Sequence, residues 1–130
     1  MTQPDGTPAP SLIRGALLSR EDLIGRWQCG SASTFHRAEA DGLLVPRRRG
    51  RVLGYRWADV WAFEGGLPAP GMVEAYMEDL LTPAQGAAFC PLKPATLIAK
   101  AGTGEIPCRR IGRFVRFVPA EFAQWLEDWS

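Results

Sequence analysis

Arginine is concentrated in two short stretches that also contain glycine and aromatic residues. RRRGRVLGYRW covers residues 47–57, and RRIGRFVRF covers residues 109–117. Residues 47–56 hold five arginines, residues 109–116 hold four, and neither stretch holds an acid. A guanidinium stays charged at any relevant pH and can donate two parallel hydrogen bonds to a phosphate. The two stretches therefore predict surfaces that bind a polyanion.

The total charge conceals this distribution. The chain of 130 residues has a formal net charge of only +1. The segment 64–80 contains Glu64, Glu74, Glu78 and Asp79 but no lysine or arginine. Sorted charge creates local potentials that an average does not show, so the near-neutral total does not argue against a polyanionic partner.

Catalytic and metal-binding patterns are not found. The three cysteines, Cys29, Cys90 and Cys108, are widely spaced and form no CxxC pair, and the single histidine, His36, has no ligand-like neighbour. These features favour reduced thiols over a disulfide and argue against zinc. No Ser/His/Asp set, paired acids or phosphate-cradling glycine loop can be assembled. We therefore expect a protein that is not an enzyme and has no cofactor.

No apolar run approaches the roughly 20 residues that span a bilayer. The opening MTQPDGTPAPS lacks the basic and apolar regions of a signal peptide, and its composition is typical of disorder. We expect residues 1–15 to be a disordered arm, and the protein to be cytoplasmic and nucleoid-associated, with no membrane partner.

The chain contains an internal repeat. LLSREDL at 17–23 resembles LLTPAQG at 80–86, because in each a hydroxyl residue follows two leucines and an acid or amide comes three positions later. This spacing is that of a capping box, which marks a helix start. The predicted boxes pair Ser19 with Asp22 and Thr82 with Gln85. The next helices are predicted in SASTFHRAEADG (31–42) and KPATLIAKAGTG (93–104), ending at Gly42 and Gly104.

Each half continues with a hairpin and a closing helix. Gly50 and Gly112 sit between short alternating segments, a pattern typical of a β-hairpin. Closing helices are predicted over 58–64 and 119–129. The second has apolar residues at helical spacing, Phe122, Trp125, Leu126 and Trp129, and we expect the aromatic residues to lie in the core.

The predicted fold is α+β, mainly α, with two tandem winged helix-turn-helix units over 16–64 and 80–130. Each unit has a helix-turn-helix, a two-stranded wing and a C-terminal helix. Residues 65–79 begin with the breaker GGLPAPG and form a linker, in which Met72, Tyr76 and Leu80 suggest a short connector helix. Units below 50 residues are near the lower limit for an independent core, so we expect the halves to pack together.

The ordered motifs resemble the excisionase type of the MerR-like winged helix family. The ending GEIPCRRIGRFVRFVPAEFAQWL carries most of this resemblance, through Gly104, Pro107, Gly112, Arg116, Phe117, Glu121 and Trp125. The first half follows the same order less closely, through Thr34, Gly42, Pro46, Arg56, Trp57 and Asp59. The resemblance implies that the second helix of each unit enters the major groove of DNA while the wing meets backbone or minor groove.

Candidate DNA-binding residues follow from this resemblance. On the recognition helices they are Ser33, Thr34, His36, Arg37, Lys93, Thr96 and Lys100; on the wings they are Arg47, Arg48, Arg49, Arg51, Arg109, Arg110 and Arg113. Arg37 is the best candidate for reading guanine. Its counterpart is Ala99, and Gly102 is expected to interrupt that helix, so base reading should concentrate in the first unit.

Four further charged residues have other expected roles. Glu39 and Asp41 are expected to point away from DNA. Arg56 and Arg116 each precede an aromatic residue, where a structural role beneath the wing competes evenly with a DNA contact.

The favoured function is sequence-specific binding of double-stranded DNA, as an excisionase-like architectural factor or a transcription regulator. Two joined readers could occupy half-sites about 34 Å apart, with an integrase or RNA polymerase as partner and possible oligomerisation on DNA. Two alternatives stay open. One is the DNA-recognition subunit of a phage packaging or replication assembly. The other is a protein-interaction module without DNA binding, which the acidic segment 64–80 would favour.

Overall fold

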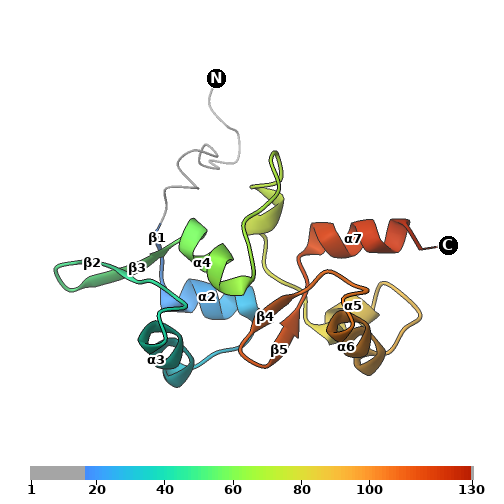
Figure 1. The fold of residues 1–130 in the computed structure, drawn as a ribbon, viewed down its shortest axis with the longest axis horizontal. Coiled ribbons are helices and arrows are strands. Elements are labelled where there is room, and N and C mark those ends of the chain that lie inside the picture. Colours follow the sequence, from blue (N-terminus) through green and yellow to red (C-terminus); the bar gives the residue numbers. More distant parts are fainter. Residues whose placement is uncertain (1–16, 130) are drawn as a thin grey trace.

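The computed structural model describes residues 17–129 (Figure 1), so the arm expected over 1–15 lies outside the described residues. The predicted fold class is confirmed: the molecule is α+β, mainly helical, with two small winged helix-turn-helix units. The first unit runs through β1 (Leu17–Leu18), α2 (Arg20–Trp27), α3 (Ala32–Ala40), β2 (Arg47–Arg49), β3 (Val52–Arg56) and α4 (Trp57–Glu64). After η1 (Ala75–Met77), the second runs through α5 (Pro83–Ala87), α6 (Pro94–Gly102), β4 (Arg109–Ile111), β5 (Phe114–Arg116) and α7 (Pro119–Glu127).

Both predicted capping boxes are present. The hydroxyl of Ser19 accepts from the amide of Asp22 at 3.0 Å, and the Asp22 carboxylate accepts from the Ser19 amide at 2.9 Å. Thr82 and Gln85 make the same reciprocal pair at 3.1 and 3.0 Å. Each pair satisfies amides that a helix start leaves without partners, so α2 and α5 begin where the sequence predicts.

The ends of α3 and α6 also follow the prediction, because Gly42 and Gly104 have left-handed φ values of +71° and +82°. The following amides bond back to Ala38 and Lys100 at 2.9 and 3.0 Å, which closes each helix in the same way. Gly102, which was expected to interrupt the helix, is the last residue of α6. One glycine costs a helix about 1 kcal/mol, and the buried Leu97 and Ala101 anchor the same turns.

The hairpins turn at Gly50 and Gly112, whose φ values are +63° and +60°. In the first hairpin Arg47 pairs with Gly54, and in the second Arg109 pairs with Arg116. Hairpin register therefore makes Arg116 the counterpart of Gly54. Arg56, the other residue that precedes an aromatic, lies two positions further along β3.

A third strand was not expected from the sequence. β1 pairs with the outer edge of β3, placing Leu18 opposite Tyr55. The second unit has the same pairing as a single bridge between Leu81 and Phe117. Each hairpin is therefore tied to the residues just before its own first helix.

The hydrophobic core joins the two units. One cluster contains Trp27, Phe35 and Tyr55 of the first unit together with Ile111 and Val118 of the second. A smaller cluster centres on Leu97, Ile106, Val115, Phe117 and Phe122. The halves pack together as expected, because one core cluster contains side chains from both units.

The C-terminal apolar stripe is only partly buried, which corrects the expectation that its aromatic residues all lie in the core. Phe122 is 1% exposed and Trp125 is half-buried, but Trp129 is 45% exposed. α7 ends at Glu127, so Trp129 lies beyond the helix, with its ring against that of Trp125 at a centroid distance of 5.3 Å.

Polar contacts fix the second unit against the first. The buried Arg116 donates through Nε to the carbonyl of Trp27 at 2.7 Å and through Nη2 to that of Gln28 at 3.3 Å. The amide of Leu80 donates to the carbonyl of Arg26 at 2.9 Å. Arg26 itself forms a buried two-pronged ion pair with Glu64, with both N–O distances 2.8 Å.

The segment between the units packs against both of them. Where a connector helix was expected, η1 forms a 3-10 helix of three residues. Its Tyr76 accepts a bond from the Trp61 indole at 3.2 Å through its carbonyl and donates its hydroxyl to Glu121. Within residues 17–129, each helix is too short or too polar to cross a lipid bilayer.

Candidate nucleic-acid interface

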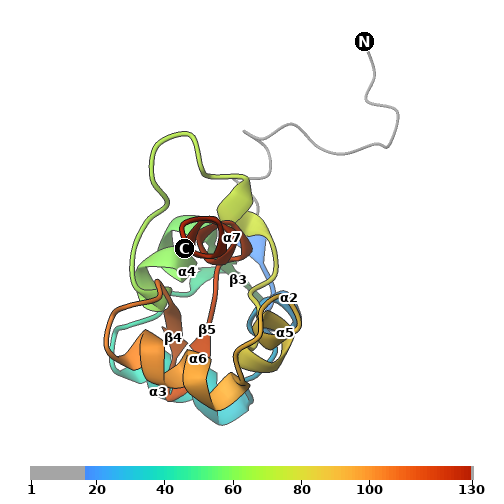
Figure 2. The ribbon, with the colours of Figure 1, turned by 90° about the vertical axis from the view of Figure 1, so that its right-hand side faces the viewer.

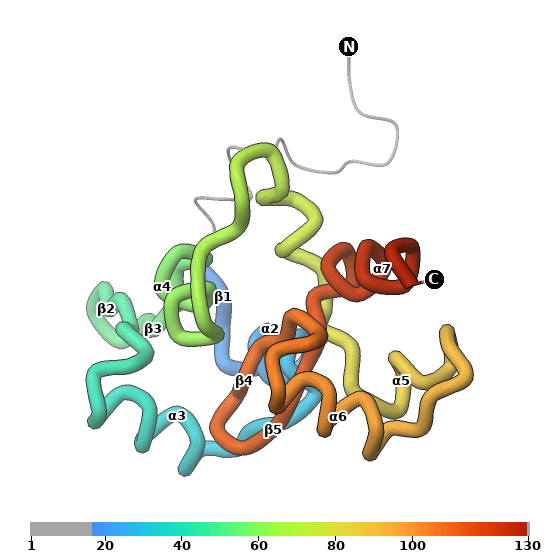
Figure 3. The backbone as a smooth tube through the Cα atoms, turned by 45° about the vertical axis from the view of Figure 1, so that its right-hand side comes forward, coloured from blue at the N-terminus to red at the C-terminus, as the bar shows by residue number. Residues whose placement is uncertain are grey.

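Three elements line one face of the molecule. α3, the turn of the β4–β5 hairpin and α6 lie in that order along the lower side in Figures 1 and 3. Figure 2, at a right angle, keeps both helices on this lower side. The β2–β3 hairpin instead projects from the end of the molecule beside α3 (Figure 1).

α3 presents polar side chains to solvent on its first two turns. Ser33, His36 and Arg37 are exposed, whereas Phe35 and Ala38 face the core. Thr34 is half-buried because its hydroxyl accepts from the amide of Ser31 at 3.2 Å and caps the helix start. The exposed face therefore offers hydrogen-bonding groups of short and long reach.

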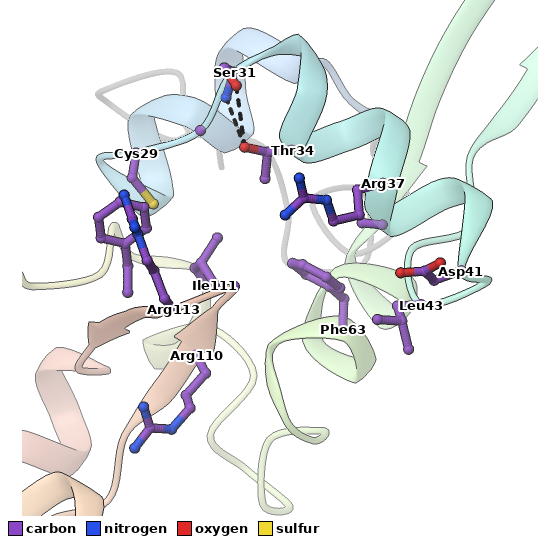
Figure 4. A pocket seen from close by; sticks show the side chains of 14 residues that line it. Cys29, Ser31, Thr34, Arg37, Asp41, Leu43, Phe63, Arg110, Ile111 and Arg113 are labelled. Carbon is purple, nitrogen blue, oxygen red and sulfur yellow. Dashed lines mark hydrogen bonds between the residues drawn. The ribbon is translucent and has the colours of Figure 1, made fainter.

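A hollow of about 810 Å³ lies between α3 and the β4–β5 turn. Figure 4 shows Arg37 extending from α3, Arg113 on the opposite side of the hollow, and Arg110 below it with its guanidinium directed away from Arg37. Apolar groups complete the lining, among them Leu43, Phe63 and Phe114. The three guanidiniums make no ion pair with any residue of the described part of the chain, and such a cluster attracts anions.

The first hairpin carries most of its charge in solvent. Arg48, Arg49 and Arg51 are exposed. Arg47 is half exposed and pairs with Asp59 in the first turn of α4 at 3.1 Å. Three guanidiniums of this wing therefore remain available around Gly50.

Arg109 occupies the same strand position as Arg47 but is buried. It donates to the carbonyl of Gly66 at 2.7 Å, lies 3.9 Å from the carboxylate of Glu121 and stacks over Tyr76. Only 7% of the residue is exposed. We therefore leave Arg109 out of the interface that the sequence assigned it to, and Arg116 out for the same reason.

α6 offers fewer groups than α3. Lys93 is exposed at the N-terminal cap and Thr96 is half-buried. Lys100 pairs with Glu105 at 2.7 Å in the last turn. α6 therefore presents fewer unpaired polar side chains to solvent than α3, in line with Ala99 standing where α3 has Arg37.

The two acids of α3 have different surroundings. Glu39 accepts from the Tyr55 hydroxyl and from Arg20, the latter at 3.1 Å, so it is held by its own unit. Asp41 is exposed and lines the hollow instead of turning away from it. Burial, and then the bond to Glu39, raise the pKa of Tyr55.

The cysteines are free thiols, each half-buried. Cys29 lies at the rim of the hollow, where burial raises its pKa although the nearby Arg116 acts in the opposite direction. Among residues 17–129, no three His, Cys, Asp or Glu side chains converge as a metal site would require.

Sequence reasoning found most of these side chains but not their grouping. It assigned Arg110 and Arg113 to the second wing, yet the structure places them beside the helix of the first unit. The cause is the contact of Arg116 with Trp27, which joins residues far apart in the chain. No local pattern signals such a contact.

Comparison with known proteins supports the fold of the second unit. Residues 80–130, which include α5, α6, the β4–β5 hairpin and α7, match the family model of a helix-turn-helix domain. No curated protein and no solved structure matches the chain. The structure and the family match together show that the second unit is a helix-turn-helix domain.

Proposed function

We propose that this protein binds double-stranded DNA sequence-specifically, in the manner of an excisionase or transcription regulator of the MerR-like winged helix type. Its two units, over 16–64 and 80–130, would occupy adjacent half-sites and act by shaping the DNA. An integrase or RNA polymerase would be the protein partner at such a site. The observation that carries the proposal is the cluster of Arg37, Arg110 and Arg113 around one hollow on the face of α3.

The exposed arginines divide into two roles. Hairpin arginines at Gly50 and Gly112 sit on strands and turns, where a flexible guanidinium meets phosphates and fixes the position of the protein without reading bases. Arg37 projects from a helix whose neighbours Ser33 and His36 are also exposed. A helix fits the major groove, where an arginine pairs with O6 and N7 of guanine.

Two variants test this division on a site obtained by selection from random duplexes and mapped by footprinting. Arg37→Ala should relax preference at one or two base pairs and cost about 1–3 kcal/mol on the selected site. Arg48→Ala with Arg49→Ala should weaken binding to all sequences and flatten the salt dependence by about 0.9 for each phosphate that is no longer neutralised. Both are measured by fluorescence anisotropy across a salt series.

Equal effects of the two variants on selected and scrambled duplexes would contradict the division of roles. Lack of binding to any mixed duplex at low salt would contradict DNA binding itself and leave the protein-interaction alternative. That alternative drew on the acidic segment 64–80, but Glu64 is buried against Arg26 and adds no surface charge. A stable ring or higher oligomer without DNA, seen by light scattering, would favour the packaging or replication alternative.

A further inference from the structure

The turn of the β4–β5 hairpin belongs to the second unit by sequence but lies beside the recognition helix of the first. Arg110, Gly112 and Arg113 line the same hollow as Ser31 and Arg37 (Figure 4). In Figures 1 and 3 the turn stands between α3 and α6. A wing is expected to flank the helix of its own unit; here it flanks the helices of both.

Buried contacts hold the turn in this place. Ile111, at the end of β4, is 1% exposed and belongs to the core cluster that joins the two units. Arg116 on β5 is 7% exposed and donates to the carbonyls of Trp27 and Gln28, which lead from α2 into α3. Packed cores do not deform continuously, so these contacts fix the position of the hairpin against the end of α2 and the start of α3.

The β2–β3 hairpin has no such central position. It extends from the far end of the first unit, on the side away from α6 (Figure 1). Its tip residues Arg48, Arg49, Arg51 and Val52 are exposed. The two hairpins are alike in sequence but differ in place, one at the middle of the molecule and one at an end.

Electrostatics favours an anion in the central hollow. Arg37, Arg110 and Arg113 line it, with one acid, Asp41, on the rim. Guanidiniums without ion-pair partners create a positive local potential, and a phosphate beside them would accept charge-assisted hydrogen bonds.

We propose that the β4–β5 turn is a central phosphate clamp shared by α3 and α6. The protein then binds DNA as one rigid reader, with this turn at the middle of the site and the β2–β3 turn at one outer edge. The inference rests on the proposed function, because it specifies how that DNA is held.

A cleavage probe attached at matched positions tests the placement. Val52 and Phe114 follow the two turns at equivalent hairpin positions, and both are exposed and uncharged. In a background with Cys29, Cys90 and Cys108 changed to Ser, each is replaced by Cys and labelled with an iron chelate that cuts nearby DNA. The background protein without an added cysteine is the control.

With the full chain bound to its selected duplex, the probe at Phe114→Cys should cut near the centre of the footprint. The probe at Val52→Cys should cut at one end. Cutting by the Phe114→Cys probe at an outer edge would overturn the clamp while leaving DNA binding intact. If neither labelled protein nor the control protects any duplex, the proposed function fails first.

A second measurement tests rigidity without altering the protein. Inserting about 5 base pairs, half a helical turn, between the mapped half-sites rotates one away from the other. A rigid reader should fall toward non-specific affinity, on the order of 10³-fold weaker. Unchanged affinity would mean two independently tethered units and would overturn the proposal.

Charge variants complete the test. Arg110→Ala with Arg113→Ala should remove protection at the centre of the site, whereas Arg48→Ala with Arg49→Ala should remove it at one edge. Loss at the same edge in both variants would contradict a shared central clamp. Binding of an acidic peptide, with duplex failing to compete for it, would assign the hollow to a protein partner instead.

Discussion

Arg47 and Arg109 occupy the same strand position in the two hairpins, and each faces an acid in the first turn of the following helix. Their side chains differ in exposure, 50% against 8%. An exposed ion pair contributes about 0–1 kcal/mol and can open. The buried guanidinium of Arg109 also donates to the carbonyl of Gly66. If Arg109 moved away, this carbonyl would lose its hydrogen-bond donor. Because it is exposed, Arg47 can exchange Asp59 for another anion, whereas the buried Arg109 is fixed in the fold.

Both tyrosines of the chain should titrate late in the folded protein. Burial and then a bond to a carboxylate raise the pKa of each, Glu39 acting on Tyr55 and Glu121 on Tyr76. Unfolding returns both to about 10, so above that pH the unfolded chain releases protons first. The free energy of unfolding should be fully retained below about pH 10 and decline as pH rises through the folded pKa values.

The measurement is the ultraviolet absorbance of tyrosinate against pH, with and without denaturant. Tyr55→Phe isolates the transition of Tyr76. A native titration that coincides with the denatured one would refute the raised pKa values.

At the scale of the elements, two exposed glycines should respond oppositely to alanine. Gly25 lies inside α2 with nothing within 4 Å of an added Cβ, so Gly25→Ala should stabilise by about 0.5–1 kcal/mol. Gly42 has equally open space but a φ of +71°, so Gly42→Ala should destabilise by about 1–2 kcal/mol. Denaturant unfolding of both variants compares the two effects, and changes of the same sign would contradict the assigned backbone conformations.

The starts and ends of these helices could be predicted from the sequence, because they depend on residues that lie close together in the chain. The capping boxes and the left-handed glycines act within a few positions, so sequence spacing carries them. β1 has only two residues, too few for an alternating pattern, and its pairing with β3 depends on where the chain returns. The exposure of Trp129 was missed because helical spacing shows which residues share a stripe but not where the helix ends.

For the whole molecule, Arg116 should decide whether the units unfold together. Arg116→Met removes the donor to two carbonyls of the first unit and should cost about 2–3 kcal/mol. Arg56→Met, at an exposed position, should change stability by no more than about 0.5 kcal/mol. We expect the unaltered protein to show coincident transitions by circular dichroism and tryptophan fluorescence, and Arg116→Met to separate them.

The arrangement of the units could be anticipated only in part. Their small size predicted that they would pack together. The contact that orients them was left open, because Arg116 could equally have reached DNA. Its burial depends on carbonyls at the end of α2 that accept two bonds, which is a property of the folded surface. The candidate residues of the interface could be named from the sequence, but their arrangement on the surface could not.

The contact through Arg116 joins two different surfaces, the hairpin of the second unit and the end of α2 in the first. Contacts between unlike surfaces of similar units can in principle repeat without limit. In the first unit the equivalent position is Gly54, where even a Cβ would approach Leu17 to 2.8 Å. A side chain at that site would have to displace Leu17, so the first hairpin cannot make the contact that Arg116 makes without a local rearrangement. The joint through Arg116 is therefore specific to the second hairpin.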